Sequence, residues 1–357
     1  MSSYTESVII GKGRYSNFFT SFGWKDKSIF SKQGAQRRHY CRWFSWGGAI
    51  DTTMSPLDSI RYHKSFLRTG FMSMDPRTGH VKAYVGGIDY NDFQYDMVNG
   101  GRRQIGSTIK PYLYSLAMIE GISPCDEMLH VQQRLTDENG RLWEPRNSNK
   151  KRIGEMVSVQ WGLQNSDNWV TAWLMSQLSP YTFVRLLHSF GLKNEMDPVV
   201  SICLGTPDVS VGEMVSGYTT FANKGIRVEP LYVTRIEDPY GNTIANFNSQ
   251  MSEVLTEDAS YKMLHMLKNV IDGGTGGRIR ARYGIKAPMG GKTGTTQNNS
   301  DGWFMGFTPS LVSGVWVGGE DRPISLHLRS QLRLWYSLVS RPWLPTCSVS
   351  TSQCSQT

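Results

Sequence analysis

The sequence has few cysteines, few histidines and no long apolar run, and each shortage excludes a class of protein. Its five cysteines are scattered among 357 residues and odd in number, which argues against a disulfide framework. No cysteine pair has metal-ligand spacing and the seven histidines do not cluster, so no zinc site is expected. No stretch approaches the ~18 consecutive apolar residues of a membrane-spanning helix, and no signal peptide is apparent. As written, the chain is expected to stay in the cytoplasm, an expectation that does not extend to a longer parent protein.

Acidic residues are scarce relative to basic ones, and the imbalance lies at the two ends of the chain. Lys and Arg number 38 against 30 Asp and Glu, which gives a formal charge of +8. Subtracting +6 for residues 1–42 and +3 for residues 324–357 leaves −1 for residues 43–323. A nucleic-acid-binding face needs basic residues on the folded body. Nucleic acid is therefore not expected as a partner.

Strand-like runs fall at both ends of the body, with helical patterns between them. The predicted strands are residues 71–75, 80–85, 290–296, 302–307 and 311–317, with a further hairpin of 231–237 and 243–247. The predicted helices are 112–119, 154–178 with an interruption at 166–168, 211–222 and 258–272, and a polar surface loop is expected at 134–152. Because the terminal strands can pair, the sequence predicts one α+β domain with a mostly antiparallel sheet.

Three short motifs occur in a telling order. Ser107 and Lys110 form S-x-x-K, Ser166 to Asn168 form S-D-N, and Lys292 to Gly294 form K-T-G. Each motif alone is a weak signal, since S-x-x-K arises by chance in many chains. The ordered set is the signature of serine acyl-transfer enzymes.

The spacing has a chemical meaning. Ser107 and Lys110, three apart on a helix, share one face. A serine hydroxyl needs a neighbour to take its proton. Lys110 can do so only when neutral, and burial together with a second cation, Lys292, would lower its pKa. Ser166 could relay a proton to the leaving group, and Asn168 could hold Lys110 and the substrate amide.

A tetrahedral intermediate also needs two N–H donors for its oxyanion. The amide of Ser107, at a helix start, and the amide of Thr295, on the strand, are the candidates. A carboxylate-bearing substrate would find a cation and hydroxyls at Lys292, Thr293 and Thr295. Gly294 removes a side chain where such a substrate would lie.

The longer segments around these motifs resemble a known family. Arg103–Pro111, Lys292–Gln297 and Asp301–Pro309 resemble motifs of the class A penicillin-binding transpeptidases. Smaller matches are Trp143–Asn147, Gly274–Gly276 and Val315–Gly318, and together they span 43–323. The resemblance implies the serine β-lactamase/transpeptidase-like fold, which is a five-stranded antiparallel sheet with helices on both faces.

The resemblance also implies a reaction and its partners. Ser107 would attack the D-Ala-D-Ala end of a peptidoglycan stem peptide, release the last D-Ala and pass the acyl group to an amine of a neighbouring stem. β-Lactam antibiotics would acylate Ser107 and remain there. No metal or organic cofactor is implied. The parent protein would be membrane-anchored, with a glycosyltransferase domain, at the periplasmic face of the bacterial inner membrane.

The resemblance does not extend to the ends of the chain. It divides the sequence into an unmatched basic segment, 1–42, a linker remnant, 43–69, the transpeptidase domain, 70–323, and an unmatched Ser/Arg-rich tail, 324–357. We hypothesise a gene fragment whose ends are read out of frame. Residues 326–340 have the spacing of a substitute amphipathic helix.

Three other functions are compatible with parts of the sequence. A P-loop NTPase would need glycine at position 286, where the sequence has Lys286, and a helix after Lys292. A β-lactamase of the same fold would need a deacylating glutamate, for which Glu195 is the nearest candidate. A penicillin sensor or inactive fragment stays open.

Several other side chains are given structural roles. We expect Trp303 and Trp316 in the sheet core, Asp167 as support for its loop, Cys125 and Cys203 as buried thiols, and Arg102 and Arg103 either at the cleft or on the surface.

Overall fold

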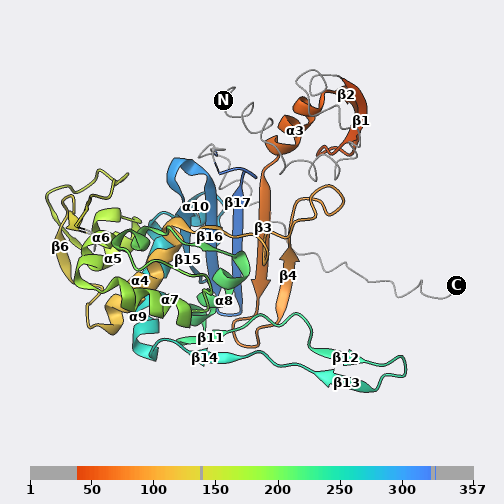
Figure 1. Ribbon diagram of the computed structural model, residues 1–357. Coiled ribbons are helices and arrows are strands. Elements are labelled where there is room, and N and C mark those ends of the chain that lie inside the picture. Colours follow the sequence, from red (N-terminus) through yellow and green to blue (C-terminus); the bar gives the residue numbers. More distant parts are fainter. Residues whose placement is uncertain (1–37, 137–139, 323–325, 327–357) are drawn as a thin grey trace.

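A five-stranded antiparallel sheet forms the centre of the computed structural model, which describes residues 38–136, 140–322 and 326 (Figure 1). Its strands, in spatial order, are β15 (Gly290–Thr295), β16 (Asp301–Thr308), β17 (Leu311–Gly318), β3 (Arg68–Met74) and β4 (Val81–Val85). Every neighbouring pair is antiparallel. The predicted α+β fold is confirmed, and the two ends of the body meet where β17 pairs with β3.

Both faces of the sheet are covered, which explains why its inner strands lack polar alternation. Successive side chains of a strand point to opposite faces. Trp303, Met305 and Trp316 therefore join the main core, whereas Phe304 and Val315 join a second, smaller cluster on the other face. Both tryptophans are buried, as predicted.

Apart from α3 (Pro56–Ser65), which lies with β1 (His39–Trp43) and β2 (Ile50–Met54) beyond one end of β3, the helices gather on the side of the sheet where β15 lies in Figure 1, with β4 at the opposite edge. These helices are α4 (Lys110–Ile119), α5 (Val159–Gln164), α6 (Asn168–Gln177), α7 (Pro180–Ser189), α8 (Val211–Ala222), α9 (Glu257–Gly273) and α10 (Arg278–Ala281). Side-chain caps begin several of them. Ser210 and Glu213 form a reciprocal capping box on α8, and Thr256 caps α9. Helix α4 is buried from Lys110 to Met118 and so forms the centre of the main core.

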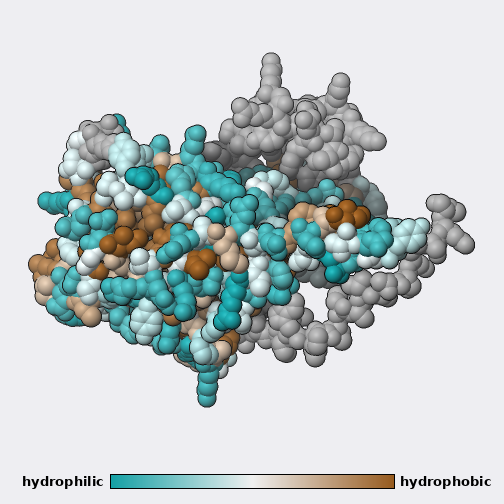
Figure 2. All heavy atoms as spheres, turned by 90° about the horizontal axis from the view of Figure 1, so that it is seen from below, coloured by the Kyte–Doolittle hydropathy of each residue, from teal (hydrophilic) through white to brown (hydrophobic). Residues whose placement is uncertain are grey.

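Short strand pairs surround this body. They are β1 (His39–Trp43) with β2 (Ile50–Met54), β5 (Arg103–Gln104) with β10 (Asp208–Val209), β6 (Glu127–Leu129) with β9 (Met156–Ser158), β7 (Leu135–Thr136) with β8 (Leu142–Trp143), β11 (Ile226–Val228) with β14 (Met251–Glu253), and β12 (Arg235–Glu237) with β13 (Thr243–Asn246). The last pair is the predicted outer hairpin, and it projects from the body (Figure 1). Apolar surface gathers on this hairpin and over the helical part in Figure 2, and Ile244 of β13 is 68% exposed.

Three local predictions need correction. The helix expected from residue 154 starts only at Val159, because Arg152 and Gly154 have positive φ angles and the segment after them pairs with β6 as β9. The polar stretch 134–152 contains the strands β7 and β8. The outer hairpin begins at Arg235, whereas Leu231 makes an isolated bridge with His80.

The predictions for cysteines and for the tail had different outcomes. Cys203 is buried, as predicted, but Cys125 is exposed, because it lies in a turn whose backbone bonds to the Ser123 hydroxyl. The helix expected at 326–340 lies outside the described residues, apart from Leu326.

Candidate active site

Ser107 lies in a short 3-10 helix, Gly106–Ile109, that runs directly into α4. The turn depends on Gly106, whose φ is +51°, a value that other residues rarely adopt. A Cβ at this position would lie 2.7 Å from the carbonyl oxygen of Thr295. The glycine therefore lets the serine turn press against the end of β15, which brings Ser107 and Thr295 together.

Lys110, the first residue of α4, is fully buried and holds the S-D-N segment in place. Its Nζ donates to the carbonyl oxygens of Ser166 (2.7 Å) and Asp167 (3.1 Å) and to Oδ1 of Asn168 (2.7 Å). Two of the predicted motifs are therefore joined by direct hydrogen bonds through one ammonium group.

Lys292 joins the third motif to the same segment. Its Nζ donates to Oγ of Ser166 at 2.8 Å and to the carbonyl oxygen of Thr293 at 3.1 Å. Ser166 has a φ of +56°, a left-handed conformation that is costly for a residue with a side chain. Such strain persists only where the surroundings impose it. Here it turns the hydroxyl toward one lysine and the carbonyl toward the other.

The two lysines form an unusual electrostatic pair. Both are 0% exposed, and within the described part of the chain neither forms an ion pair with a carboxylate. Burial lowers the pKa of Lys110 to about 8. Burial, followed by the charge of Lys110, lowers the pKa of Lys292 well below its ordinary value. A neutral amine is therefore accessible at ordinary pH, as the chemistry of a serine nucleophile requires.

Strand β15 presents the predicted substrate-binding residues along one edge of the sheet. Thr293 donates from its Oγ1 to Oγ1 of Thr275 at 3.0 Å, and Thr295 is exposed. A Cβ on Gly294 would lie 2.8 Å from the carbonyl oxygen of Ile105, so only glycine lets the strand approach the serine turn. Thr275 had no predicted role of its own, although it lies in a segment that carried the resemblance.

A buried carboxylate, Asp301, ties the serine turn to the sheet from behind. Its Oδ1 accepts from Nε of Arg103 (2.7 Å) and Nε1 of Trp316 (3.0 Å), and its Oδ2 accepts from Oγ1 of Thr296 (2.9 Å). Arg103 is thus buried against this carboxylate and does not lie on the surface. Arg102 makes a bidentate pair with Glu213 near the surface.

Two residues that support the S-D-N segment were not predicted from the sequence. Asn147 accepts the backbone N–H of Asn168 on its Oδ1 at 3.3 Å and donates to Oδ2 of Asp167 at 2.7 Å. His130 lies 3.0 Å from the same carboxylate oxygen. Asn147 falls in a segment that carried the resemblance, whereas His130 has no local pattern that could have identified it. Asp167 supports its loop, as predicted.

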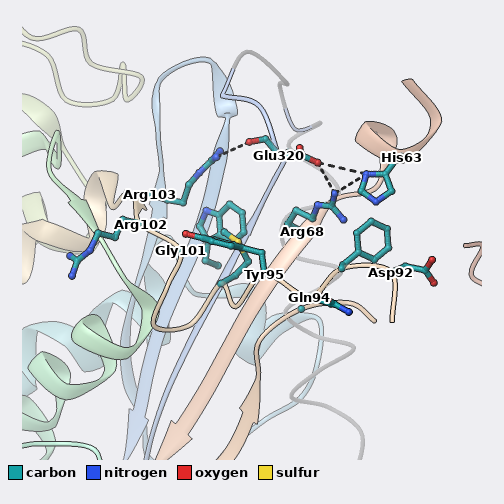
Figure 3. A pocket seen from close by; sticks show the side chains of 14 residues that line it. His63, Arg68, Asp92, Gln94, Tyr95, Gly101, Arg102, Arg103 and Glu320 are labelled. Carbon is teal, nitrogen blue, oxygen red and sulfur yellow. Dashed lines mark hydrogen bonds and ion pairs between the residues drawn. The ribbon is translucent and has the colours of Figure 1, made fainter. Parts of the chain in front are cut away.

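A cavity of about 410 Å³ lies elsewhere and contains none of the predicted site residues (Figure 3). Arg68, Arg103 and Glu320 line it, and Glu320 accepts from both arginines, through its side chain for Arg68 and its backbone carbonyl for Arg103. Phe93 and Trp316 lie under the two guanidinium groups. A cavity with polar lining is a default candidate for a site, but these charges are paired, and the nucleophile and its lysines are elsewhere.

The fold also bears on the other predictions. Residues Lys292 to Thr295 continue as β15 and pair with β16, so the helix required by a P-loop is absent there. Among the described residues, no group of three His, Cys, Asp or Glu side chains could hold a metal ion. In the same part of the chain, no helix has the length and apolarity to span a membrane.

Comparisons with known families agree with this geometry. The model described as the penicillin-binding protein transpeptidase domain matches residues 69–318. A second, the penicillin-binding protein middle domain, matches residues 3–67, a range that contains most of the segment set apart above as unmatched. The division of the chain at residues 42 and 69 stays a prediction.

Curated relatives align with this chain over only part of their own length. Penicillin-binding protein 2D of Bacillus subtilis is 32% identical over 71% of this chain and 37% of its own. Penicillin-binding protein 1A of Aquifex aeolicus is 32% identical over 75% of this chain and 37% of its own. The chain therefore spans little more than a third of these relatives.

Solved structures share the fold. Penicillin-binding protein 1A from Haemophilus influenzae aligns with a TM-score of 0.70 at 22% identity, over 77% of this chain and 48% of that one. The PonA1 protein from Mycobacterium tuberculosis in complex with penicillin V aligns with a TM-score of 0.63 at 21% identity, over 90% of this chain and 85% of that one. With the family match over 69–318, the chain belongs to the penicillin-binding proteins and carries their transpeptidase domain.

Proposed function

We propose that this chain is a D-Ala-D-Ala transpeptidase that cross-links peptidoglycan stem peptides through an acyl-enzyme on Ser107. The observation that carries the proposal is the convergence of Lys110 and Lys292 on the single residue Ser166, beside the serine turn. Two buried lysines without carboxylate partners destabilise the fold, and such an arrangement is characteristic of sites that do proton chemistry.

In the first half-reaction, Oγ of Ser107 forms a bond to the carbonyl carbon of the penultimate D-Ala, and the peptide C–N bond breaks. Neutral Lys110 accepts the hydroxyl proton. A proton reaches the leaving amine through the Ser166 hydroxyl, which Lys292 orients at 2.8 Å. The terminal D-Ala departs as a free amino acid.

In the second half-reaction, an amine of a neighbouring stem attacks the ester carbonyl. A new peptide bond forms, the bond to Ser107 breaks, and the hydroxyl recovers its proton. The amides of Ser107 and Thr295 would stabilise the oxyanion in both steps. Lys292, Thr293 and Thr295 would bind the terminal carboxylate, Gly294 leaves room for the peptide, and Asn168 would hold its amide.

A β-lactam would follow the first half-reaction, with its ring amide as the bond that breaks. The leaving nitrogen stays attached to the acyl group, so the product remains on Ser107. The PonA1 protein, which has been solved in complex with penicillin V, shares this fold. We place the parent protein in the cell envelope, where stem peptides occur, with a glycosyltransferase domain elsewhere in its chain.

The alternative is a β-lactamase-like hydrolase, or a sensor that binds penicillin without cross-linking. Glu195, the candidate deacylating group, is exposed on the loop after α7. A group that activates water for deacylation must contact the acyl-enzyme. This position favours the transpeptidase.

The test is labelling of the purified 357-residue chain with a fluorescent penicillin. Wild type and a Ser176→Ala control, altered on the exposed face of α6, should give a covalent band, and Ser107→Ala should give none. A band that persists in Ser107→Ala would refute the nucleophile assignment. Rapid nitrocefin turnover would favour the hydrolase, and labelling without D-Ala release from a stem pentapeptide would favour the sensor.

A further inference from the structure

Behind the S-D-N segment lies a fully buried pair, His130 and Asp167. Both side chains are 0% exposed, and His130 Nε2 lies 3.0 Å from Asp167 Oδ2. The rings of Trp161 and Trp169 pack against the imidazole, with centroids 5.2 and 5.0 Å away. The two rings help to keep water away from this pair. His130 belongs to none of the three motifs, and Asp167 has no part in the proposed proton transfers.

Both ring nitrogens of His130 face oxygen acceptors. Nδ1 lies 3.1 Å from the carbonyl oxygen of Arg152, and Nε2 faces the carboxylate of Asp167. Nε2 also lies 3.4 Å from Nδ2 of Asn147. His130 therefore bridges the loop before β9 to the S-D-N segment through its two ring nitrogens.

Asp167 is in turn hydrogen-bonded to the residues that follow it and to Lys110. Its Oδ1 accepts the backbone N–H groups of Trp169 (2.9 Å) and Val170 (3.1 Å), which caps α6. Its carbonyl oxygen accepts from Nζ of Lys110 at 3.1 Å. A rotation of the carboxylate would therefore move the cap, the strained Ser166 and the Asn168 amide together.

We propose that His130 is a positioning residue of the transpeptidase site, which acts through Asp167 to hold Ser166 and Asn168 on the two lysines. The proposal rests on the proposed function. Asn147 shares the task, because it bonds both the Asp167 carboxylate and the backbone N–H of Asn168. Loss of the His130 contact should slow acylation without removing any group that touches substrate.

The test compares His130→Phe, which keeps an aromatic ring between the tryptophans, with His130→Gln, which can restore one donor to Asp167. Acylation of the full chain by a fluorescent penicillin is followed at several concentrations, which separates the acylation rate constant from the dissociation constant of the initial complex. Small misplacements of a reacting group cost up to about 10²-fold. We expect His130→Phe to lose about 10- to 100-fold in the rate constant, and His130→Gln to recover most of it, with the dissociation constant little changed.

The matched control is His188→Gln on α7, whose Nδ1 contacts only the Leu192 carbonyl among the contacts described, and it should acylate like wild type. Wild-type acylation by His130→Phe, or equal slowness of the Phe and Gln variants, would overturn the proposal. If His130→Phe does not fold, Asp167→Asn decides instead: a comparable loss supports the proposal and an unchanged rate constant overturns it. Absence of labelling in wild type would instead defeat the proposed function.

Discussion

Two clusters of buried charged residues in this protein differ in whether their charges are paired. Beside Ser107, Lys110 and Lys292 are like charges that share Ser166, with no carboxylate paired to either in the described part of the chain. Behind the serine turn, Arg103 is paired with Asp301, and farther along the cavity of Figure 3 Arg68 is paired with Glu320. Both clusters bury charge, but only the second neutralises it.

The difference separates chemistry from support. Burial lowers the pKa of both lysines, and the charge of Lys110 lowers that of Lys292 further, so a neutral amine becomes available. A pair of opposite charges keeps both groups ionised and fixes their positions. Removing a lysine should therefore cost activity, whereas removing the carboxylate should cost stability.

The largest expected effect is the loss of acylation in Lys110→Met. The substitution removes the group that accepts the hydroxyl proton, and general-base catalysis contributes about 10²- to 10⁴-fold. We expect a loss of about 10³-fold in the rate of β-lactam acylation. Because the substitution also removes three hydrogen bonds to the S-D-N segment, the thermal midpoint is measured alongside to separate lost chemistry from lost stability. A variant that acylates normally would place the base elsewhere.

Asp301→Ala should remove the buried ion pair with Arg103 and so lower the stability of the protein. It leaves the Arg103 guanidinium buried without its carboxylate, and breaking a buried pair in this way costs about 3–5 kcal/mol. Urea unfolding measures the loss, with Asp321→Ala, which removes an exposed partner of Lys64, as the control. A loss in Asp301→Ala no greater than in the control would show that the pair does not hold the turn.

The pH dependence distinguishes the clusters without any substitution. The pKa of Lys110 falls to about 8, so acylation should rise about tenfold per pH unit below 8 and level off above it. The unfolded chain, with a lysine pKa of about 10.4, binds more protons between pH 8 and 10.4, so stability should rise across that window. Lys110→Met should weaken this rise. An acylation rate independent of pH between 6 and 8 would contradict the assignment of Lys110 as the base.

The smallest expected effect is that of Arg102→Ala, next to Arg103 in the sequence. Its pair with Glu213 is partly exposed, with 37% of the Arg102 side chain accessible, and such surface pairs contribute at most about 1 kcal/mol. Acylation should be unchanged. A loss of stability as large as that of Asp301→Ala would mean that the exposure of an ion pair does not determine how much it stabilises this protein.

The motifs identified residues that the fold brings together, because these residues lie in short segments with their own spacing. Ser107 with Lys110, and Ser166 with Asn168, carry recognisable spacing, and residues 302–307 form a strand-like run. The Arg103–Asp301 pair joins residues 198 positions apart, and no local spacing reports such a contact. His130 was missed for the same reason, because only the folded chain brings its strand end to Asp167.

The central claim is that Ser107 is the nucleophile, and mass spectrometry of the acylated chain tests it directly. Incubation with benzylpenicillin and digestion with trypsin should add one penicilloyl group to the peptide that begins at Gln104, which contains Ser107. We expect the adduct on Ser107 itself, and no adduct in Lys110→Met treated for the same short time. An adduct on Ser166, on Lys292 or on no residue of the site would contradict it.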